Sequence, residues 1–264
     1  MTVDPLFDLT GRVAIVTGGL GQMGAVYTAG LTERGMRVAV FDVAAEPGAH
    51  GDLVRHYKVD VTERTSIEEA TSAVVSEWGV PDLLLCNAAL DSPPDAPPEE
   101  VGPFETYPET SFDEVMDVNV KGVLLCCQVV GAHMAAAGRG SIVNVSSIYG
   151  LLSPQQDLYD FRRGDGETFF KPVAYSVSKS ALLNLTRYLA TYWAKAGVRV
   201  NTLTLGGIFN DQPRAFLDGY EARVPLGRMA DPAEALGAVV FLASDASSYV
   251  TGANVVVDGG WSAW

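Results

Sequence analysis

Tyr175 and Lys179 are the two side chains in this sequence whose types and spacing best suit proton transfer. They are four residues apart, so in a helix they would lie on one face, one turn from each other. A free phenol, with a pKa of ~10, transfers protons poorly at neutral pH, whereas a neighbouring ammonium favours the phenolate and lowers that pKa. The pair is therefore a candidate acid/base group, although the same spacing also occurs on solvated helix faces without function.

A glycine-rich turn near the N-terminus has the features of a dinucleotide-binding site. A short apolar strand is expected at Arg12–Thr17, and after the turn and a helix the second strand, Arg37–Phe41, leads directly into Asp42. Glycines allow the backbone to approach a pyrophosphate, whose charge the N-terminus of the next helix stabilises. The residues expected to contact the cofactor in this turn are Gly18, Gly21, Gln22, Met23 and Gly24. The alternative is a glycine turn that binds no ligand.

The carboxylate of Asp42 predicts which dinucleotide is bound. At the end of the second strand it can accept hydrogen bonds from both adenosine ribose hydroxyls, which are present in NAD. The same negative charge would repel the 2′-phosphate of NADP. The sequence therefore favours NAD as the cofactor.

Short apolar strands alternate with helical patterns along the whole chain, which predicts a mostly parallel sheet with helices on both faces. The expected fold is α/β, a single-domain Rossmann fold over residues 1–264 with a doubly wound, seven-stranded parallel sheet. The predicted strands are Arg12–Thr17, Arg37–Phe41, His56–Val59, Asp82–Leu85, Ser141–Ser146, Val198–Leu203 and Asn254–Val257. Helices are predicted at Ser66–Trp78, Phe112–Ala137 with Ser111 as its cap, around Tyr175 and Lys179, and at Pro232–Leu242.

Composition restricts the classes of partner. The net charge of −14 and the pI near 4.5 argue against nucleic acid and against anionic membrane surfaces. No apolar run approaches the ~20 residues that span a bilayer, and the N-terminus lacks the pattern of a signal peptide, which predicts a cytoplasmic protein. Cys86, Cys126 and Cys127 are expected to be buried free thiols, and the scattered histidines predict no metal site.

Several motifs in order along the chain resemble those of the short-chain dehydrogenase/reductase family, over essentially its full length. The cofactor turn, the catalytic set and the C-terminal signature each match. The matching segments are Thr17–Gly24, Asp60-Val61, Cys86–Ala89, Asn119, Ser147, Tyr175 with Lys179, Arg199–Asn201, Gly206–Ile208 and Val257–Gly260.

The resemblance implies a role for each residue of the catalytic set. Tyr175 would exchange a proton with the substrate oxygen, and Lys179 would lower the pKa of Tyr175 and contact the nicotinamide ribose. Ser147 would hold the substrate oxygen at the carboxyl edge of the sheet, where open α/β sheets bind ligands. Asn119 would hold a water of a proton relay, or act as a helix-kinking residue bonded to nearby backbone, or both.

Further contacts follow from the same resemblance. Additional cofactor contacts are expected from Asp60, Val61, Asn87, Ala88, Tyr175, Lys179 and Ile208. Contacts with the substrate are expected from residues beside the catalytic serine and from the loops that should frame the pocket, namely Ser147, Tyr149, Arg162, Arg163, Gly207, Asn210 and Arg214.

The chain departs from the family pattern in three places. The middle glycine of the cofactor turn stands at Gly21, one position earlier than usual, so Gln22 could approach either the pyrophosphate or the mouth of the active site. Leu205 and Asn210 stand where proline and threonine are usual. An insertion at Ser153–Pro172 follows the catalytic serine and is expected to cover or line the substrate pocket, the alternative being a solvated surface loop.

The loops around the pocket predict a polar substrate. The insertion and the segments Leu90–Ser111 and Leu205–Val224 carry arginines, amides and acids, whereas a steroid or long acyl chain would need a more apolar pocket. A polyol or sugar is therefore expected, in one version with an anionic group that an arginine would pair, unless the arginines pair with surface carboxylates instead. The insertion and C-terminal segment resemble oxidoreductases of bacterial sugar and nonulosonate (flagellin-modification) pathways.

Three functions remain open from the sequence. The favoured one is an NAD-dependent dehydrogenase that interconverts a secondary alcohol and a ketone or lactone. The others are an NADPH-type carbonyl reductase of the 3-oxoacyl kind, which Asp42 disfavours, and a non-catalytic NAD-binding sensor or structural subunit, which the complete catalytic set disfavours. The apolar helices around Asn119 and Tyr175 predict a homo-oligomer, a dimer or tetramer, to which Trp261 and Trp264 could contribute.

Overall fold

One mixed sheet forms the centre of the molecule. The computed structural model describes residues 4–91, 97–164 and 168–264, and in them eight strands are arranged in the order β3-β4-β2-β1-β5-β6-β7-β8. The strands are β1 Val13–Thr17, β2 Arg37–Asp42, β3 Gly48–Ala49, β4 Val54–Lys58, β5 Leu83–Cys86, β6 Gly140–Ser147, β7 Val198–Leu205 and β8 Asn254–Val257. The single-domain α/β Rossmann-type architecture is thus as predicted.

The predicted number of seven strands was wrong by one. The eighth strand, β3, contains only Gly48 and Ala49 and pairs antiparallel with β4 at the sheet edge, whereas the other pairings are parallel. Two small residues produce neither an apolar run nor an alternating pattern, so this strand depends on its neighbour and not on its own sequence. The strand predicted at His56–Val59 in fact begins at Val54.

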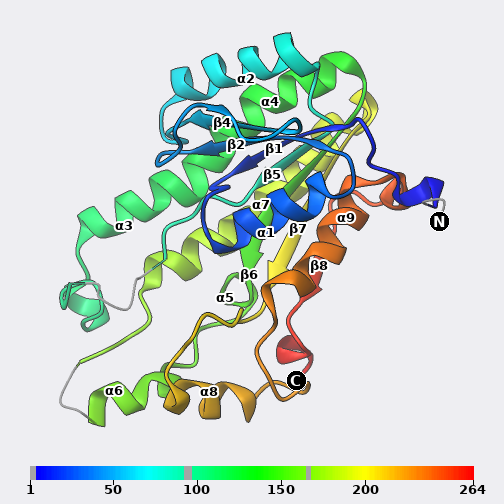
Figure 1. The fold of residues 1–264 in the computed structure, drawn as a ribbon. Coiled ribbons are helices and arrows are strands. Elements are labelled where there is room, and N and C mark those ends of the chain that lie inside the picture. The colour runs from blue at the N-terminus through cyan, green and yellow to red at the C-terminus, as the bar shows by residue number, and fades with distance from the viewer. Residues whose placement is uncertain (1–3, 92–96, 165–167) are drawn as a thin grey trace.

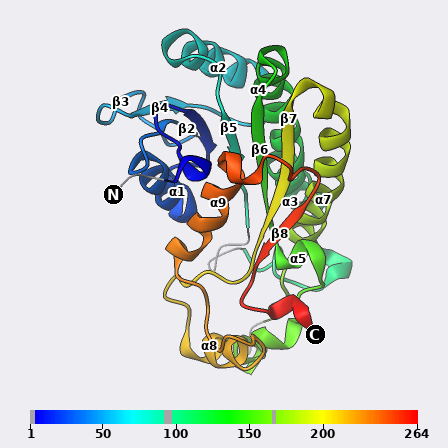
Figure 2. The same ribbon diagram turned by 90° about the vertical axis from the view of Figure 1, so that its right-hand side faces the viewer.

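Helices cover both faces of the sheet, so that the molecule has three layers (Figures 1 and 2). On one face α2, α4 and α7 pack against a core that includes Ile15, Leu84 and Ile142 of the sheet. On the other face α1 and α9 pack against a core that includes Val16 and Leu85. The helices are α1 Gln22–Thr32, α2 Arg64–Trp78, α3 Glu109–Met116, α4 Val123–Ala137, α5 Ile148–Leu151, α6 Asp160–Gly164, α7 Val173–Trp193, α8 Arg214–Glu221 and α9 Leu236–Ala243. The three cysteines are buried and free, as predicted.

The long helix that contains Asn119 differs from its prediction at both its start and its interior. It begins at Glu109 with Pro108 as the cap, so Ser111 lies inside it. A π-helical turn, Asp117–Gly122, separates α3 from α4. By length and composition the whole run, Glu109–Ala137, could cross a membrane, contrary to the sequence-based expectation, but half of its most apolar window is buried in the molecule. It therefore has the character of a core helix.

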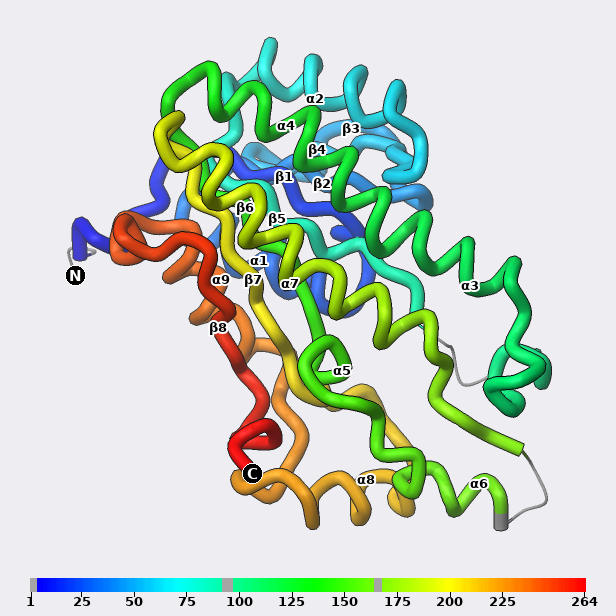
Figure 3. Tube along the Cα trace, turned by 180° about the vertical axis from the view of Figure 1, so that it is seen from behind, coloured from blue at the N-terminus to red at the C-terminus, as the bar shows by residue number. Residues whose placement is uncertain are grey.

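The carboxyl edge of the sheet carries a small second core. Figures 1 and 3 show α5, α6 and α8 gathered below the ends of the central strands. Leu158 of the insertion, Tyr220 of α8 and Trp261 near the C-terminus are buried together there. The loop predicted at Leu205–Val224, with at most one helical turn, therefore contains the eight-residue helix α8. Residues 92–96 of the first loop and 165–167 of the insertion lie outside the described residues.

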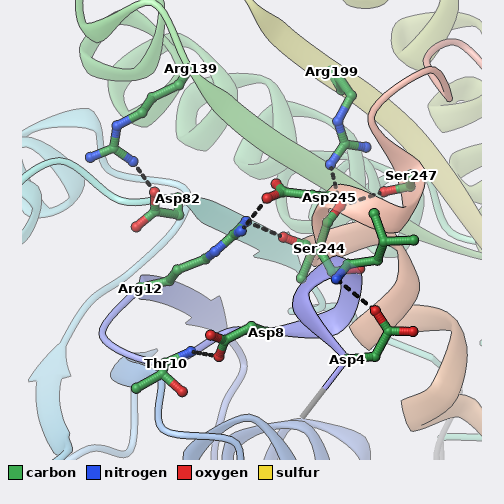
Figure 4. A network of polar contacts seen from close by, with 12 residues as sticks. Asp4, Asp8, Thr10, Arg12, Asp82, Arg139, Arg199, Ser244, Asp245 and Ser247 are labelled. Atoms are coloured by element: carbon green, nitrogen blue, oxygen red, sulfur yellow. Dashed lines mark hydrogen bonds and ion pairs between the residues drawn. The ribbon is translucent and has the colours of Figure 1, made fainter. Parts of the chain in front are cut away.

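The opposite, amino edge of the sheet is held by ion pairs between segments distant in sequence (Figure 4). Arg12 pairs with Asp245 at 2.8 Å, and Arg139 pairs with Asp82, whose second oxygen accepts the main-chain N–H that begins β1. Arg199 donates to main-chain carbonyls at the end of α9. These charges therefore hold together segments that are far apart in the sequence.

Candidate active site

The glycine turn after β1 is closely packed against the end of β5. Gly18 has φ +61°, and a Cβ there would lie 2.7 Å from the Cα of Ala88, so the backbone conformation and the space both require glycine. The side-chain amide of Asn87 donates to the main-chain oxygens of Thr17 and Gly18 at 3.1 and 3.0 Å. The hydroxyl of Thr17 accepts the main-chain N–H groups of Asn87 and Ala88. These bonds fix the turn at the point between β1 and β5 where the strand order reverses.

The N-terminus of α1 fits a pyrophosphate group. Gly21 is its cap and makes no side-chain hydrogen bond, so the first N–H groups of the helix have no side-chain acceptor. At Gly24 a Cβ would lie 2.1 Å from the oxygen of Gly18, which keeps the helix close to the turn. Gln22 and Met23 line the cavity that also contains Tyr175. A helix end with unbonded N–H groups beside a cavity is suited to a phosphate anion.

Asp42 lies beside the same turn, at the end of β2. One carboxylate oxygen accepts the main-chain N–H of Leu20 at 3.1 Å and the other accepts that of Ala44 at 3.0 Å. The carboxylate is therefore fixed in orientation next to the cofactor turn. Asp60 bonds Thr62 in its own turn, and Val61 is buried, where its side chain would be 2.8 Å from a Cβ on Gly122 of the π-helical turn.

Asn119 is fully buried in the π-helical turn and uses its whole side-chain amide in the structure. Its Oδ1 accepts the N–H of Leu90 at 2.7 Å, and its Nδ2 donates to the oxygen of Leu90 at 2.9 Å and to the hydroxyl of Ser178 at 3.0 Å. Ser178 in turn donates to the main-chain oxygen of Tyr175. Asn119 therefore ties the loop after β5 to α7, and a water-holding role would fall to its main-chain carbonyl.

Ser147, Tyr175 and Lys179 converge at the carboxyl edge. Ser147 ends β6 and caps α5, and its hydroxyl lies close enough to Tyr175 for hydrogen bonding to lower the pKa of Tyr175. Lys179 is buried, its Nζ lies 5.7 Å from the centroid of the Tyr175 ring, and it donates to the main-chain oxygen of Val145 at 3.0 Å. The helical spacing of Tyr175 and Lys179 is thus as predicted, and both side chains line the same cavity as Ser147.

The pKa of Tyr175 is shifted in the direction opposite to the one the sequence predicts. Burial, reinforced by the negative charge of Asp91, raises the pKa of Tyr175, while the bond with Ser147 opposes the rise. Burial also lowers the pKa of Lys179 to about 8, so this ammonium is itself readily neutralised. The prediction that Lys179 lowers the pKa of Tyr175 counted the charge and missed the desolvation of both groups.

A cavity of about 710 Å³ extends from the glycine turn to the insertion. Ser147, Tyr175 and Lys179 of the predicted catalytic set line it, as do Tyr149, Gly207 and Arg162 of the predicted substrate set. Asn87 and Ile208 of the predicted cofactor set line it as well. The guanidinium of Arg162 stacks over the ring of Phe169, 4.2 Å from its centroid, within the insertion. The insertion is therefore a wall of the cavity.

Three predicted substrate residues are placed away from this cavity. Arg163 pairs with Asp160 and donates to main-chain oxygens of the insertion, including that of Phe169 at 3.2 Å. Arg214 pairs with Asp218 on the outer side of α8. Asn210 bonds the side chain of the nearby Gln212 through its main chain. These three residues do not line the cavity, because each is bonded to a partner in its own segment. Composition alone does not reveal such local contacts.

The sequence left open whether Gln22 approaches the pyrophosphate or the mouth of the active site. Its Nε2 donates to the main-chain oxygen of Phe209 at 2.9 Å, so the side chain bridges the glycine turn and the loop after β7. Gln22 therefore lies at the mouth of the cavity and connects the two halves of the site.

Several residues of the cavity were not predicted. The hydroxyl of Tyr220 accepts the N–H of Gly207 at 2.6 Å, and Tyr159 bonds Tyr149. Lys171 and Asp91 form an ion pair beside Tyr175. The aromatic content of the insertion was a usable signal for Tyr159, but nothing in the spacing of Lys171 and Asp91, 80 residues apart, indicates their contact.

The comparisons with known proteins agree with this geometry. A family model described as enoyl-(acyl carrier protein) reductase matches residues 21–262. D-threitol dehydrogenase of Mycolicibacterium smegmatis is 32% identical and aligns over 99% of this chain and 97% of its own. The chain belongs to the short-chain dehydrogenase/reductase family. The predicted oxidoreductase of this family, acting on CH–OH groups, is thereby confirmed.

Other members of the short-chain dehydrogenase/reductase family are similar over the same extent. The cis-4-hydroxycyclohexanecarboxylate dehydrogenase of Sinomonas cyclohexanicum is 35% identical over 96% of this chain and 97% of its own. A short-chain dehydrogenase of Leptospira borgpetersenii serovar Hardjo-bovis, solved with bound NAD⁺, superposes with a TM-score of 0.86 at 30% identity and covers 99% of this chain and 97% of its own. Both proteins therefore align with this chain over nearly its whole length.

Proposed function

We propose that this protein is an NAD-dependent dehydrogenase that oxidises a secondary alcohol of a polar, polyol-like or sugar-like substrate. The observation that carries the proposal is the shared cavity. Ser147 and Tyr175 line its inner end, the uncapped start of α1 lines one side, and polar groups of the loops line the outer end. Binding, orientation and proton transfer can then occur in one cavity.

The residues of the chain divide the reaction among themselves. When bound, the nicotinamide supplies the hydride acceptor. Ser147 holds the substrate oxygen, and Tyr175, to which Ser147 is bonded, accepts its proton as the C–O bond becomes a carbonyl. Lys179 holds positive charge within the same cavity and stabilises the phenolate form of Tyr175 that exists before the proton is accepted.

The composition of the outer wall supports a polar substrate with a limited apolar part. Arg162, Lys171 and Asp91 are charged, whereas Phe169 and Phe216 provide aromatic surface. The threitol enzyme named above acts on a polyol, and the cyclohexanecarboxylate enzyme acts on a ring that carries a carboxylate. A hydroxylated substrate that also carries a carboxylate would use both kinds of wall, with Arg162 as a cation for the anionic group.

The substrate proposal can be tested by following NADH formation at mildly alkaline pH with a panel of compounds. The panel contains polyols, sugars, sugar acids, hydroxylated cyclohexanecarboxylates and simple apolar secondary alcohols. Turnover with polyols or hydroxy acids is expected. Turnover confined to apolar alcohols would contradict the polar pocket, and no turnover with any alcohol would contradict the dehydrogenase proposal and favour a sensor that only binds NAD.

The preference for NAD is tested by replacing Asp42. We expect Asp42→Ala to raise the ratio of kcat/KM with NADP to that with NAD by ~10–100-fold, because the repulsion of the 2′-phosphate and the ribose bonds are both removed. The measurement is steady-state kinetics with each cofactor at a fixed alcohol concentration. Asp52→Ala, which removes an exposed acid nearby in sequence, is the control. An unchanged ratio in Asp42→Ala would show that Asp42 does not select the cofactor.

Assembly and location remain proposals as well. The two helices predicted to pair between subunits carry large exposed side chains. These are Leu124 on α4, and Tyr188 and Tyr192 on α7. They support a homodimer or homotetramer with closed symmetry. Trp261 was proposed as an intersubunit residue but is buried against Tyr220 of its own chain, whereas Trp264 is exposed. The cytoplasmic location and the resemblance to oxidoreductases of nonulosonate pathways remain predictions from the sequence.

A further inference from the structure

A second ion pair lies in the cavity beside the catalytic tyrosine. Lys171 directly precedes α7, and its side chain, 9% exposed, pairs with Asp91 of the loop after β5. The ammonium of Lys171 also lies over the ring of Tyr175, 4.9 Å from the centroid. Both members of the pair line the same cavity as Tyr175. The pair is therefore in contact with the acid/base group, although it is absent from the predicted catalytic set.

The main chain of Lys171 is held in place by one side chain of the insertion. Gln156 accepts the N–H of Lys171 at 2.8 Å and donates to its carbonyl oxygen at 3.2 Å. The main-chain oxygen of Gln156 accepts a hydrogen bond from Arg163 at 2.8 Å, and that guanidinium stacks over Phe170. Arg163 thus lies behind the cavity wall and supports Lys171. This gives a structural role to an arginine that was predicted to contact the substrate.

The charged and hydroxyl groups that face Tyr175 come from five segments. Lys179 comes from the same helix, Lys171 from the segment before it, Asp91 from the loop after β5, and the hydroxyls of Ser147 and Tyr149 from the end of β6 and from α5. Among the described residues that line the cavity, Asp91 carries the only carboxylate. Its negative charge opposes formation of a phenolate at Tyr175, and the same charge acts on Lys179 and on Tyr159.

We propose that Lys171 is a positioning residue for proton transfer, which holds the carboxylate of Asp91 and offsets its charge so that Tyr175 can ionise. This inference rests on the proposed dehydrogenase function. The insertion then contributes more than a wall, because it delivers the countercharge that makes an acid tolerable next to the catalytic phenol. It also gives a reason for the two hydrogen bonds between Gln156 and Lys171. They keep the ammonium of Lys171 close to Asp91, and the attraction between two charges weakens with distance.

The test is a double-mutant cycle read as the pH dependence of kcat/KM for alcohol oxidation. We expect kcat/KM to increase with pH as Tyr175 ionises. In Lys171→Met the midpoint of this increase should lie about one pH unit higher, so that kcat/KM below the midpoint is ~10-fold lower. Asp91→Asn is expected to move the rise down, and Lys171→Met with Asp91→Asn to return it close to the wild-type position. Lys171→Arg, which keeps the charge, is expected to stay near the wild type.

A remote ion pair of the same construction is available as the control. Arg55 pairs with Glu77 at 2.9 Å and lies over the ring of Trp78, 5.6 Å from its centroid, at the far side of the sheet. Arg55→Met makes the same change in net charge as Lys171→Met and is expected to leave the pH profile unchanged. A merely structural role for Lys171 would lower kcat/KM equally at all pH values, together with the melting temperature, without moving the profile.

The outcomes separate this inference from the function on which it rests. If the wild type oxidises an alcohol but all variants share one pH profile, the role of Lys171 is overturned while the dehydrogenase stands. A shift in the same direction for Lys171→Met and Asp91→Asn would also overturn it, because opposite charges must act oppositely. If the wild type oxidises no alcohol, both conclusions fall together.

Discussion

Substitution of Tyr175 by phenylalanine is expected to lower kcat/KM for alcohol oxidation by ~10²–10⁴-fold, the usual contribution of a positioned acid/base group. The ring remains, so the contact with Lys171 and the packing of α7 persist, and only the hydroxyl bonded to Ser147 is lost. NADH formation measured at several pH values gives the result. Binding of NAD, followed by fluorescence or calorimetry, should change little, because the glycine turn and Asp42 are untouched.

A tyrosine on the same helix provides the matched control for this substitution. Tyr188 is exposed on α7, so Tyr188→Phe removes the same hydroxyl without touching the cavity, and its kcat/KM should equal that of the wild type. Equal activity of Tyr175→Phe and Tyr188→Phe would show that proton transfer does not pass through Tyr175. A parallel loss in both would instead indicate a defect of the helix.

The second large effect is expected in Lys179→Met, which should lose activity but gain stability at neutral pH. The pKa of Lys179 is about 8 in the folded protein and ~10.4 in an unfolded chain. Between these values the unfolded state binds more protons, so the free energy of unfolding rises with pH across this window. Below about pH 8 the folded state carries the full cost of a buried ammonium. Lys179→Met removes this dependence together with the catalytic charge.

The expected measurement is therefore a difference between two proteins. The free energy of unfolding of Lys179→Met minus that of the wild type, from urea titrations, should fall by about 3 kcal/mol between pH 7 and pH 10. Taking the difference removes the contributions of the tyrosines and cysteines, which both proteins share. Lys195→Met, at an exposed lysine, should show no such trend, and kcat/KM should collapse in Lys179→Met alone. A pH-independent difference for Lys179→Met would contradict a buried, readily neutralised ammonium.

The parts of the site that could be predicted from sequence are those whose chemistry is local. The glycine turn, Asp42 and the Tyr175–Lys179 pair each lie within one strand–turn–helix unit or one helical turn, so spacing along the chain fixes spacing in space. Ser147 was found through the resemblance to the family, and its place at the end of a strand agrees with the rule that ligands bind at the carboxyl edge of an open parallel sheet. Strands such as β1 and β5 were found because each is a short, buried apolar run.

What could not be predicted depends on contacts between distant segments. Lys171 meets Asp91 across 80 residues, and β3 exists because β4 offers it a ladder. Arg163 and Arg162 are adjacent in sequence, yet one supports the insertion from behind and the other faces the cavity. The sign of the pKa shift at Tyr175 failed for the same reason, because desolvation is a property of the assembled core and not of a motif.

The hydrogen bond from Gln22 to the main-chain oxygen of Phe209 has a consequence for the order of kinetic events. It joins the turn suited to the pyrophosphate to the loop that borders the substrate cavity. That loop cannot swing outward without breaking a bond to the very residue that begins α1, so admission of substrate and escape of the dinucleotide are mechanically coupled. A compulsory-order scheme, with the dinucleotide entering first and leaving last, is the kinetic behaviour that this arrangement favours.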